Sequence, residues 1–147
     1  MPRKPEQFAD HPAPFPIAPQ YRAHCTHVVD GDTIDVMVDL GLHHYAYTTI
    51  RIAGIDTSEI FRPKNEAEKQ HGLEAKTFLE TLVLDKPVKI VTRKDSTSFG
   101  RYVADVWCVA PDGMVPARLD VMRDDAGVFW LNVAKVLIDA GFEKRDA

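Results

Sequence analysis

The chain has 147 residues, of which 45% are hydrophobic and only 8 are glycine, and its formal net charge at pH 7 is −4. This length predicts one domain with a sizeable core, and the composition excludes a disordered chain. The negative net charge argues against a protein that coats nucleic acid by charge alone, and no apolar run approaches the length of a membrane span.

The first twenty residues differ in composition from the rest. They are rich in proline and carry basic residues, but they contain no apolar core of the kind that a secretion signal needs. We therefore expect residues 1–20 to form an extended arm and residues 21–147 to form the folded domain. In the absence of an export signal we expect a cytoplasmic location, unless the chain is the mature form of a secreted protein.

Three strands are predicted next, over residues 22–29, 33–40 and 44–54. In the second, VVDGDTIDVMVDLG at 28–41, Ile34, Val36, Val38 and Leu40 share one parity, as in a half-buried strand. Asp32 has the parity of this apolar set. Either it shapes the Asp-Gly turn, or it points toward the core, where an unpaired charge is costly and needs a partner or a metal.

A helix follows, because apolar residues recur at helical spacing from Ala75 to Leu82, and we place it near residues 68–84. Asn65 with Glu68 resembles a capping pair that would start it earlier, whereas Gly72 argues for a later start. Two further strands are predicted at 87–93 and 101–110. The segment 114–129 is either a hairpin around Asp125–Gly127 or an irregular excursion. A second helix is predicted at 132–141, with Asn132 as its cap.

The two cysteines, Cys25 and Cys108, both fall in predicted strands. They form no Cys-x-x-Cys pair and are too few for a disulfide framework. We expect two buried free thiols, and a single bridge between them remains an alternative.

Three strands, a helix and two further strands form the element order of an OB-fold, a small Greek-key barrel that commonly binds nucleic acid. We therefore predict a mainly β, α+β protein with a five-stranded barrel, a helix between its third and fourth strands, and a C-terminal helix. The same order is compatible with an SH3-like barrel or another α+β fold.

Charged residues recur at the ends of the predicted strands: Asp32, Arg51, Asp56, Glu59 and Arg101. Carboxylates and backbone carbonyls are ligands that calcium accepts, and the arginine fork holds two phosphate oxygens at once. A glutamate near a metal can activate water. The last four of these residues also have ordinary structural explanations. Arg51 could be an outward-facing sheet arginine and Asp56 a turn cap. Glu59 could be a solvated loop residue, and Arg101 could pair with a nearby aspartate.

The motifs VVDGDTIDVMVDLG (28–41), IRIAGIDTSE (50–59) and FGRYVADVW (99–107) closely resemble the staphylococcal-nuclease-like, or thermonuclease, family. The resemblance covers roughly residues 24–110 and the last helix. It implies an OB-type barrel and a calcium-dependent phosphodiesterase that acts on DNA and RNA and leaves 3′-phosphate ends. The binding partner would be a DNA or RNA substrate, with no membrane, and the protein would be a monomer.

The resemblance also implies roles for individual residues. Asp32 and Asp56 would bind calcium, with the backbone carbonyl of Thr57 as a further ligand. Arg51 and Arg101 would bind phosphate, and Glu59 would activate water. The family commonly has proline where Ser58 stands, so we expect looser placement of Glu59. Because some relatives keep the barrel without the chemistry, a catalytically weak or silent nucleic-acid or protein binding module is the alternative function.

Overall fold

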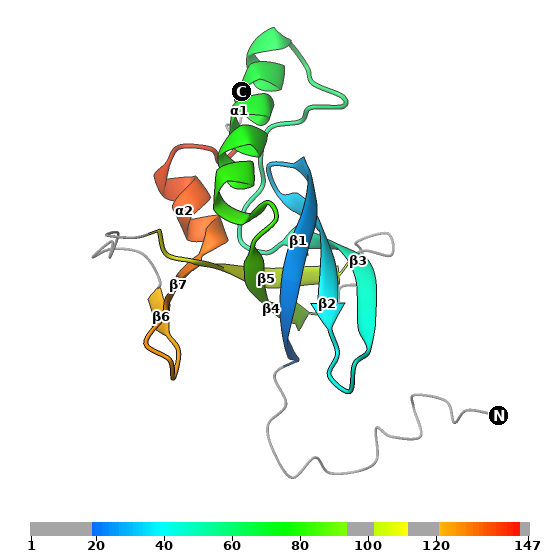
Figure 1. Cartoon of the computed structure of the whole chain (residues 1–147). Helices are drawn as coiled ribbons and strands as arrows, with labels where there is room; N and C mark the ends of the chain where they lie inside the picture. Colours follow the sequence, from blue (N-terminus) through cyan, green and yellow to red (C-terminus); the bar gives the residue numbers. More distant parts are fainter. Residues whose placement is uncertain (1–18, 94–101, 112–120, 145–147) are drawn as a thin grey trace, which may run out of the picture.

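The computed structural model describes residues 19–93, 102–111 and 121–144 of the chain. These residues form seven strands and two helices in chain order (Figure 1): β1 (Gln20–Asp30), β2 (Thr33–Asp39), β3 (Tyr45–Ile52), α1 (Glu66–Val83), β4 (Pro87–Arg93), β5 (Tyr102–Val109), β6 (Val121–Arg123), β7 (Phe129–Asn132) and α2 (Val133–Asp139). The proposed arm, apart from its last two residues, lies outside the described residues.

The strands form one sheet in the order β3-β2-β1-β4-β5-β7-β6, and an additional parallel pairing between β3 and β5 closes the first five into a barrel. All other pairings are antiparallel. Helix α1 connects β3 to β4, and α2 follows β7. This arrangement confirms the predicted OB-type barrel, its inserted helix and its C-terminal helix.

Strand alternation places the core inside the barrel. Ile34 and Val36 of β2 are fully buried, as is Ile50 of β3, while the intervening positions are partly exposed. Helices α1 and α2 add Leu79 and Leu137 to the same cluster. The predicted period-two pattern of β2 is therefore confirmed, except that Leu40, just beyond the strand, is 50% exposed.

Helix α1 begins at Glu66, two residues before the predicted start, because Asn65 accepts a hydrogen bond from the backbone N–H of Glu68 at 2.8 Å. Gly72 is no obstacle to the earlier start, since it is a buried interior residue of the helix. A Cβ atom there would lie 2.6 Å from the carbonyl oxygen of Ser58. The described part of the chain contains no helix with the length and apolarity needed to cross a bilayer.

The ambiguous segment before α2 contains a hairpin, formed by β6 and β7. The Asp124 carboxylate accepts hydrogen bonds from the backbone N–H groups of Ala126 and Val128 and from the Trp130 indole. Gly127 adopts a positive φ of 82° in this turn. The hairpin alternative is therefore confirmed, whereas residues 112–120 of the same segment lie outside the described residues.

Both cysteines are free and buried. Burial raises the pKa of the Cys25 thiol, and likewise that of Cys108, to about 11. The predicted pair of buried thiols is confirmed, and no bridge joins them.

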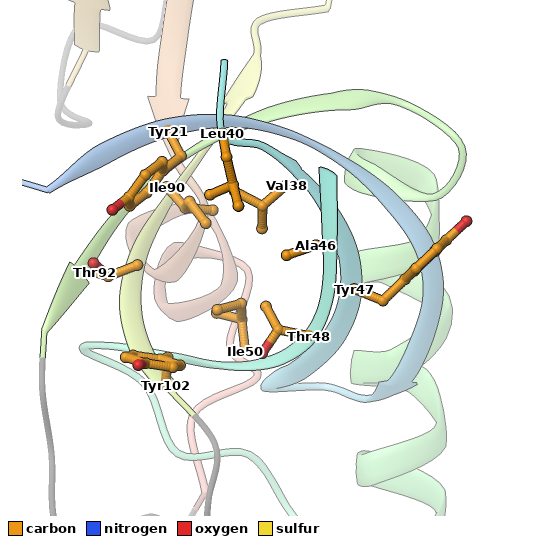
Figure 2. Close-up of a pocket in the computed structure, with 10 residues that line it drawn as sticks. All are labelled: Tyr21, Val38, Leu40, Ala46, Tyr47, Thr48, Ile50, Ile90, Thr92 and Tyr102. Carbon is orange, nitrogen blue, oxygen red and sulfur yellow. The ribbon is translucent and has the colours of Figure 1, made fainter. Parts of the chain in front are cut away.

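One mouth of the barrel is hollow. A cavity of about 360 Å³ opens there, and Figure 2 shows Val38, Ala46 and Ile50 pointing into it while Tyr47 points away from the barrel. The two faces of β3 therefore differ: the inward face carries Ala46, Thr48 and Ile50, and the outward face carries the exposed tyrosine and, further along, Arg51.

The close contact between Gly72 and Ser58 predicts that Gly72→Ala destabilises the protein, although alanine is the better helix former. The added methyl group must displace backbone rather than a flexible side chain, which costs about 1–3 kcal/mol. Thermal denaturation followed by circular dichroism measures the effect. Gln70→Ala, on the exposed part of the same helix, is the control and should change stability little; an equally stable Gly72→Ala variant would contradict the packing.

Candidate active site

Asp32 lies in the tight connection between β1 and β2 and is only 8% exposed. The neighbouring Gly31 is buried. A Cβ atom at this position would lie 2.7 Å from the Thr57 hydroxyl and 2.8 Å from the Ala75 side chain. Glycine thus lets the β1–β2 connection pack directly against Thr57 and α1. This close approach moves the Asp32 carboxylate into the protein.

The buried Asp32 carboxylate is fully engaged. Its Oδ2 atom accepts a hydrogen bond from the Thr57 backbone N–H at 3.0 Å, and its Oδ1 accepts one from the Thr33 hydroxyl at 3.0 Å. The Asp32 carbonyl accepts from the Ile52 N–H at 2.8 Å. Asp32 therefore has the polar partners that its position requires, and it joins two segments that are 25 residues apart.

Arg51 projects from the end of β3 and lies between two aspartates. Its Nη1 atom is 3.2 Å from Asp32 Oδ2, and its Nη2 is 3.4 Å from Asp56 Oδ1. Nη1 also donates to the carbonyl of Ile55 at 3.0 Å. These contacts fix a half-buried guanidinium beside both carboxylates, whereas an ordinary outward-facing sheet arginine would extend into solvent.

The structure thus brings together Asp32, Arg51, Asp56 and Thr57. Thr57 is buried and Asp56 is exposed, and Glu59 is exposed two residues further on. Within the described residues, the Glu59 carboxylate makes no side-chain hydrogen bond or ion pair, so it is open to solvent. Arg101 lies outside the described residues.

Ser58, which stands where the family commonly has proline, is held firmly. It is buried, and its hydroxyl lies 2.6 Å from Nδ1 of His71 on α1. The other ring nitrogen, Nε2, lies 2.9 Å from the carbonyl oxygen of Gly141. This chain of contacts restrains the backbone immediately before Glu59, and so it counteracts the looseness that serine would otherwise introduce.

Asp30 belongs to the same group, although the sequence analysis did not select it. Burial, together with the neighbouring Asp32 carboxylate, raises the pKa of Asp30 to about 6. Burial also acts to raise the pKa of Asp32, but hydrogen bonds with Asp30 and Thr57 and the charge of Arg51 outweigh it and lower that pKa. The Asp-Gly-Asp sequence was the available signal, since the turn that joins β1 to β2 brings the two aspartates together, and the Asp32 backbone N–H donates to Asp30 Oδ1 at 3.1 Å.

The donor atoms of the site are of the type that a hard cation accepts. Asp32 and Asp56 flank one guanidinium and Asp30 lies beside Asp32, so the described part of the site holds more carboxylates than cationic side chains. Carboxylate oxygens suit calcium, which also accepts carbonyl and water ligands. In the described residues, however, no three carboxylate, histidine or cysteine side chains converge as a ready-made metal site. The Thr57 carbonyl and water would have to complete the shell.

The raised pKa of Asp30 predicts that Asp30→Asn stabilises the metal-free protein at neutral pH. The protonated Asp30 carboxyl contributes fully to the folding stability of the wild type below pH 4. This contribution is lost as the pH rises through about 6. The amide stays neutral, so the variant should be more stable by about 1–3 kcal/mol near pH 7 and equal to the wild type in acid.

Melting temperatures measured in chelator across this pH range provide the test. Asp39→Asn is the control, because that carboxylate is exposed and bonds only the Gly41 N–H among the described residues. A stability difference that is the same in acid and at neutral pH would contradict the assigned shift.

Comparison with known proteins identifies the family of the chain. Residues 49–142 match the family described as "Staphylococcal nuclease homologue". The matched range covers Arg51, Asp56, Thr57 and Glu59, and Asp32 precedes it but is joined to it by the contacts described above. No curated protein matches the chain. The match extends over more than half of the chain and the barrel has the predicted topology, and the protein therefore belongs to the staphylococcal nuclease homologue family.

Proposed function

We propose that this protein is a calcium-dependent nuclease that hydrolyses phosphodiester bonds of DNA, RNA or both and leaves 3′-phosphate ends. The observation that carries the proposal is the fixed position of Arg51 between Asp32 and Asp56. Family membership supports a nuclease or a nucleic-acid-binding module. The alternative is a binding module, in which the same buried ion pair would serve the fold alone, and measurements of cleavage and of binding distinguish the two.

Arg51 would bind the scissile phosphate. Its guanidinium presents several N–H donors in a planar fork, and those that do not bond the main chain can reach phosphate oxygens. Because Asp32 and Asp56 hold the group in place, little side-chain freedom is lost when substrate binds. The same positive charge opposes the negative charge that develops in the pentacoordinate transition state. Arg101 would be the second phosphate-binding arginine.

Asp32, Asp56 and the Thr57 carbonyl would hold calcium, which when bound supplies positive charge to the carboxylates and to a phosphate oxygen. The lowered pKa of Asp32 keeps this carboxylate ionised at neutral pH and ready to act as a ligand. A second effect follows from charge balance. With Asp32 engaged as a ligand, its hold on Arg51 would weaken, and guanidinium donors of Arg51 would become free for the substrate.

Glu59 would accept a proton from the attacking water. Its carboxylate is exposed and, among the described residues, free of side-chain partners, while the Ser58–His71 contact fixes the backbone beside it. As the water oxygen bonds to phosphorus, the bond from phosphorus to the 5′ oxygen breaks, and the released 5′ oxygen takes a proton from solvent. The products are a 3′-phosphate and a 5′-hydroxyl.

The role of Arg51 predicts that Arg51→Ala lowers turnover by about 10²–10³-fold or more, since one preorganised charge donor is lost. Arg51→Lys should recover little activity, because lysine lacks the bidentate fork. Initial rates on single-stranded DNA and on RNA, each in calcium, in magnesium and in chelator, measure the effect.

Arg22→Ala is the matched control, since this arginine of β1 is exposed and remote in sequence from the site residues. Circular dichroism establishes that each variant is folded. Wild-type cleavage in chelator would overturn the calcium assignment. Binding of nucleic acid without cleavage, at any metal concentration, would identify the protein as a binding module.

The division of labour between Asp32 and Glu59 predicts different calcium responses. Asp32→Asn removes a charged ligand, so calcium affinity should fall by about tenfold or more and excess calcium should restore part of the rate. Glu59→Gln should leave affinity nearly unchanged and lower turnover by about 10²-fold in a way that calcium cannot restore.

Calcium titration by calorimetry, beside initial rates over a range of calcium concentrations, separates the two roles. Glu74→Gln, an exposed residue of α1 away from the site, controls for the loss of one negative charge. If Glu59→Gln loses as much calcium affinity as Asp32→Asn, then Glu59 is a ligand and not the base.

A further inference from the structure

We infer that a hollow on the outward face of β1, β2 and β3 is a subsite for an unpaired nucleobase that carries an exocyclic amino group. The hollow has a volume of about 310 Å³ and is lined by Thr26, Asp35, Tyr47, Thr48 and Thr49. This inference rests on the proposed function, because it concerns how the nucleic-acid substrate is positioned at the same site. A cavity of about 150 Å³ already holds a benzene ring, so the space suffices for a base.

The register of the strands places the hollow next to the phosphate-binding end of the barrel. Thr33 pairs with Arg51, and Asp35 pairs with Thr49 in the next outward-facing row. One such step along a strand is about 7 Å. A nucleotide whose phosphate meets the Arg51 guanidinium can therefore place its own base, or that of its neighbour, in the hollow.

Tyr47 forms the aromatic wall of the hollow. It is 74% exposed and points away from the barrel interior (Figure 2). A large aromatic ring gains little where it is surrounded by water, but it provides a flat surface for a base. Stacking of this kind is a main source of affinity in proteins that bind single strands.

Asp35 supplies the polar recognition group. Its Oδ1 accepts a hydrogen bond from the Thr49 hydroxyl at 2.6 Å, and its backbone carbonyl accepts one from the Thr26 hydroxyl at 3.3 Å. The Thr49 contact orients the carboxylate within the hollow, and carboxylate oxygens have lone pairs for further donors. A negative charge here repels a phosphate, so the hollow suits a base and not a second phosphate.

The chemistry of Asp35 determines which bases fit. An ionised carboxylate accepts hydrogen bonds only, and the N4 amino group of cytosine is a donor of the kind that Asp and Glu recognise. Uracil has an oxygen at that position, which opposes the carboxylate. Cytosine and uracil are otherwise matched in size, so they separate this hydrogen bond from stacking and from phosphate binding.

The test measures the affinities of the full-length protein for fluorescein-labelled oligo-dC and oligo-dU of equal length. Fluorescence anisotropy is measured near pH 8 in chelator, which prevents calcium-dependent turnover. Michaelis constants in calcium are determined in parallel. The wild type should bind oligo-dC about fivefold more tightly than oligo-dU. Asp35→Asn should abolish this ratio, since an amide both donates and accepts, even though removal of the charge tightens the binding of both strands.

Tyr47→Leu should weaken the binding of both strands by about fivefold or more, while Tyr47→Trp should keep or improve it. Tyr45→Leu is the matched control: Tyr45 is 60% exposed on the same strand but pairs with Asp39 and does not line the hollow. The turnover number in calcium should stay unchanged in Tyr45→Leu, because this residue touches neither the reacting groups nor the hollow.

Equal affinity of the wild type for the two strands, or equal effects of Tyr47→Leu and Tyr45→Leu, would overturn the subsite. If the protein cleaves nucleic acid without this selectivity, the subsite alone is wrong. If selective binding occurs without cleavage, the subsite stands and the nuclease proposal fails. Absence of binding to either strand, together with absence of cleavage in calcium, would refute both.

Discussion

The buried Asp32 carboxylate is the constraint on which the rest of the site depends. An ionised group that is 8% exposed is stable only with good partners, and its partners come from separate parts of the chain. Thr57 provides a backbone N–H, Arg51 a guanidinium, and Thr33 a hydroxyl. To satisfy one buried charge, the fold must therefore bring the β1–β2 connection and the segment after β3 together.

Two glycines permit this convergence through their size. Gly31 lets the β1–β2 connection meet Thr57 and α1, and Gly72 lets α1 meet the Ser58 carbonyl. The contacts of His71 with Ser58 and Gly141 then link α1 to the residues just after α2. The segment from Asp56 to Glu59 is thus restrained at several points, although it belongs to no strand or helix. Such restraint is what preorganised chemistry requires.

The negative charge of the site is larger than its single described arginine neutralises. In the metal-free protein Asp30 responds with a raised pKa of about 6, and Arg51 acts as the counter-charge of Asp32. The raised pKa of Asp30 and the counter-charge of Arg51 both limit the cost of placing carboxylates close together. The guanidinium that balances these carboxylates is also the group proposed to bind phosphate.

The strands and helices of the barrel followed from the sequence, because period-two strands and a helix with a capping asparagine are local patterns, whereas the β3–β5 pairing that closes the barrel is a contact between distant residues. Motif resemblance selected Asp32, Arg51, Asp56, Thr57, Glu59 and Arg101; the structure brings the first four into contact, and Arg101 lies outside the described residues. Only the tertiary structure decided that Asp32, although it lies in the β1–β2 turn, is a buried group bonded to the distant Thr57, that Asp30 shares its environment, and that His71 holds Ser58. Burial and contacts between residues distant in the chain fix these properties, and no local pattern records either.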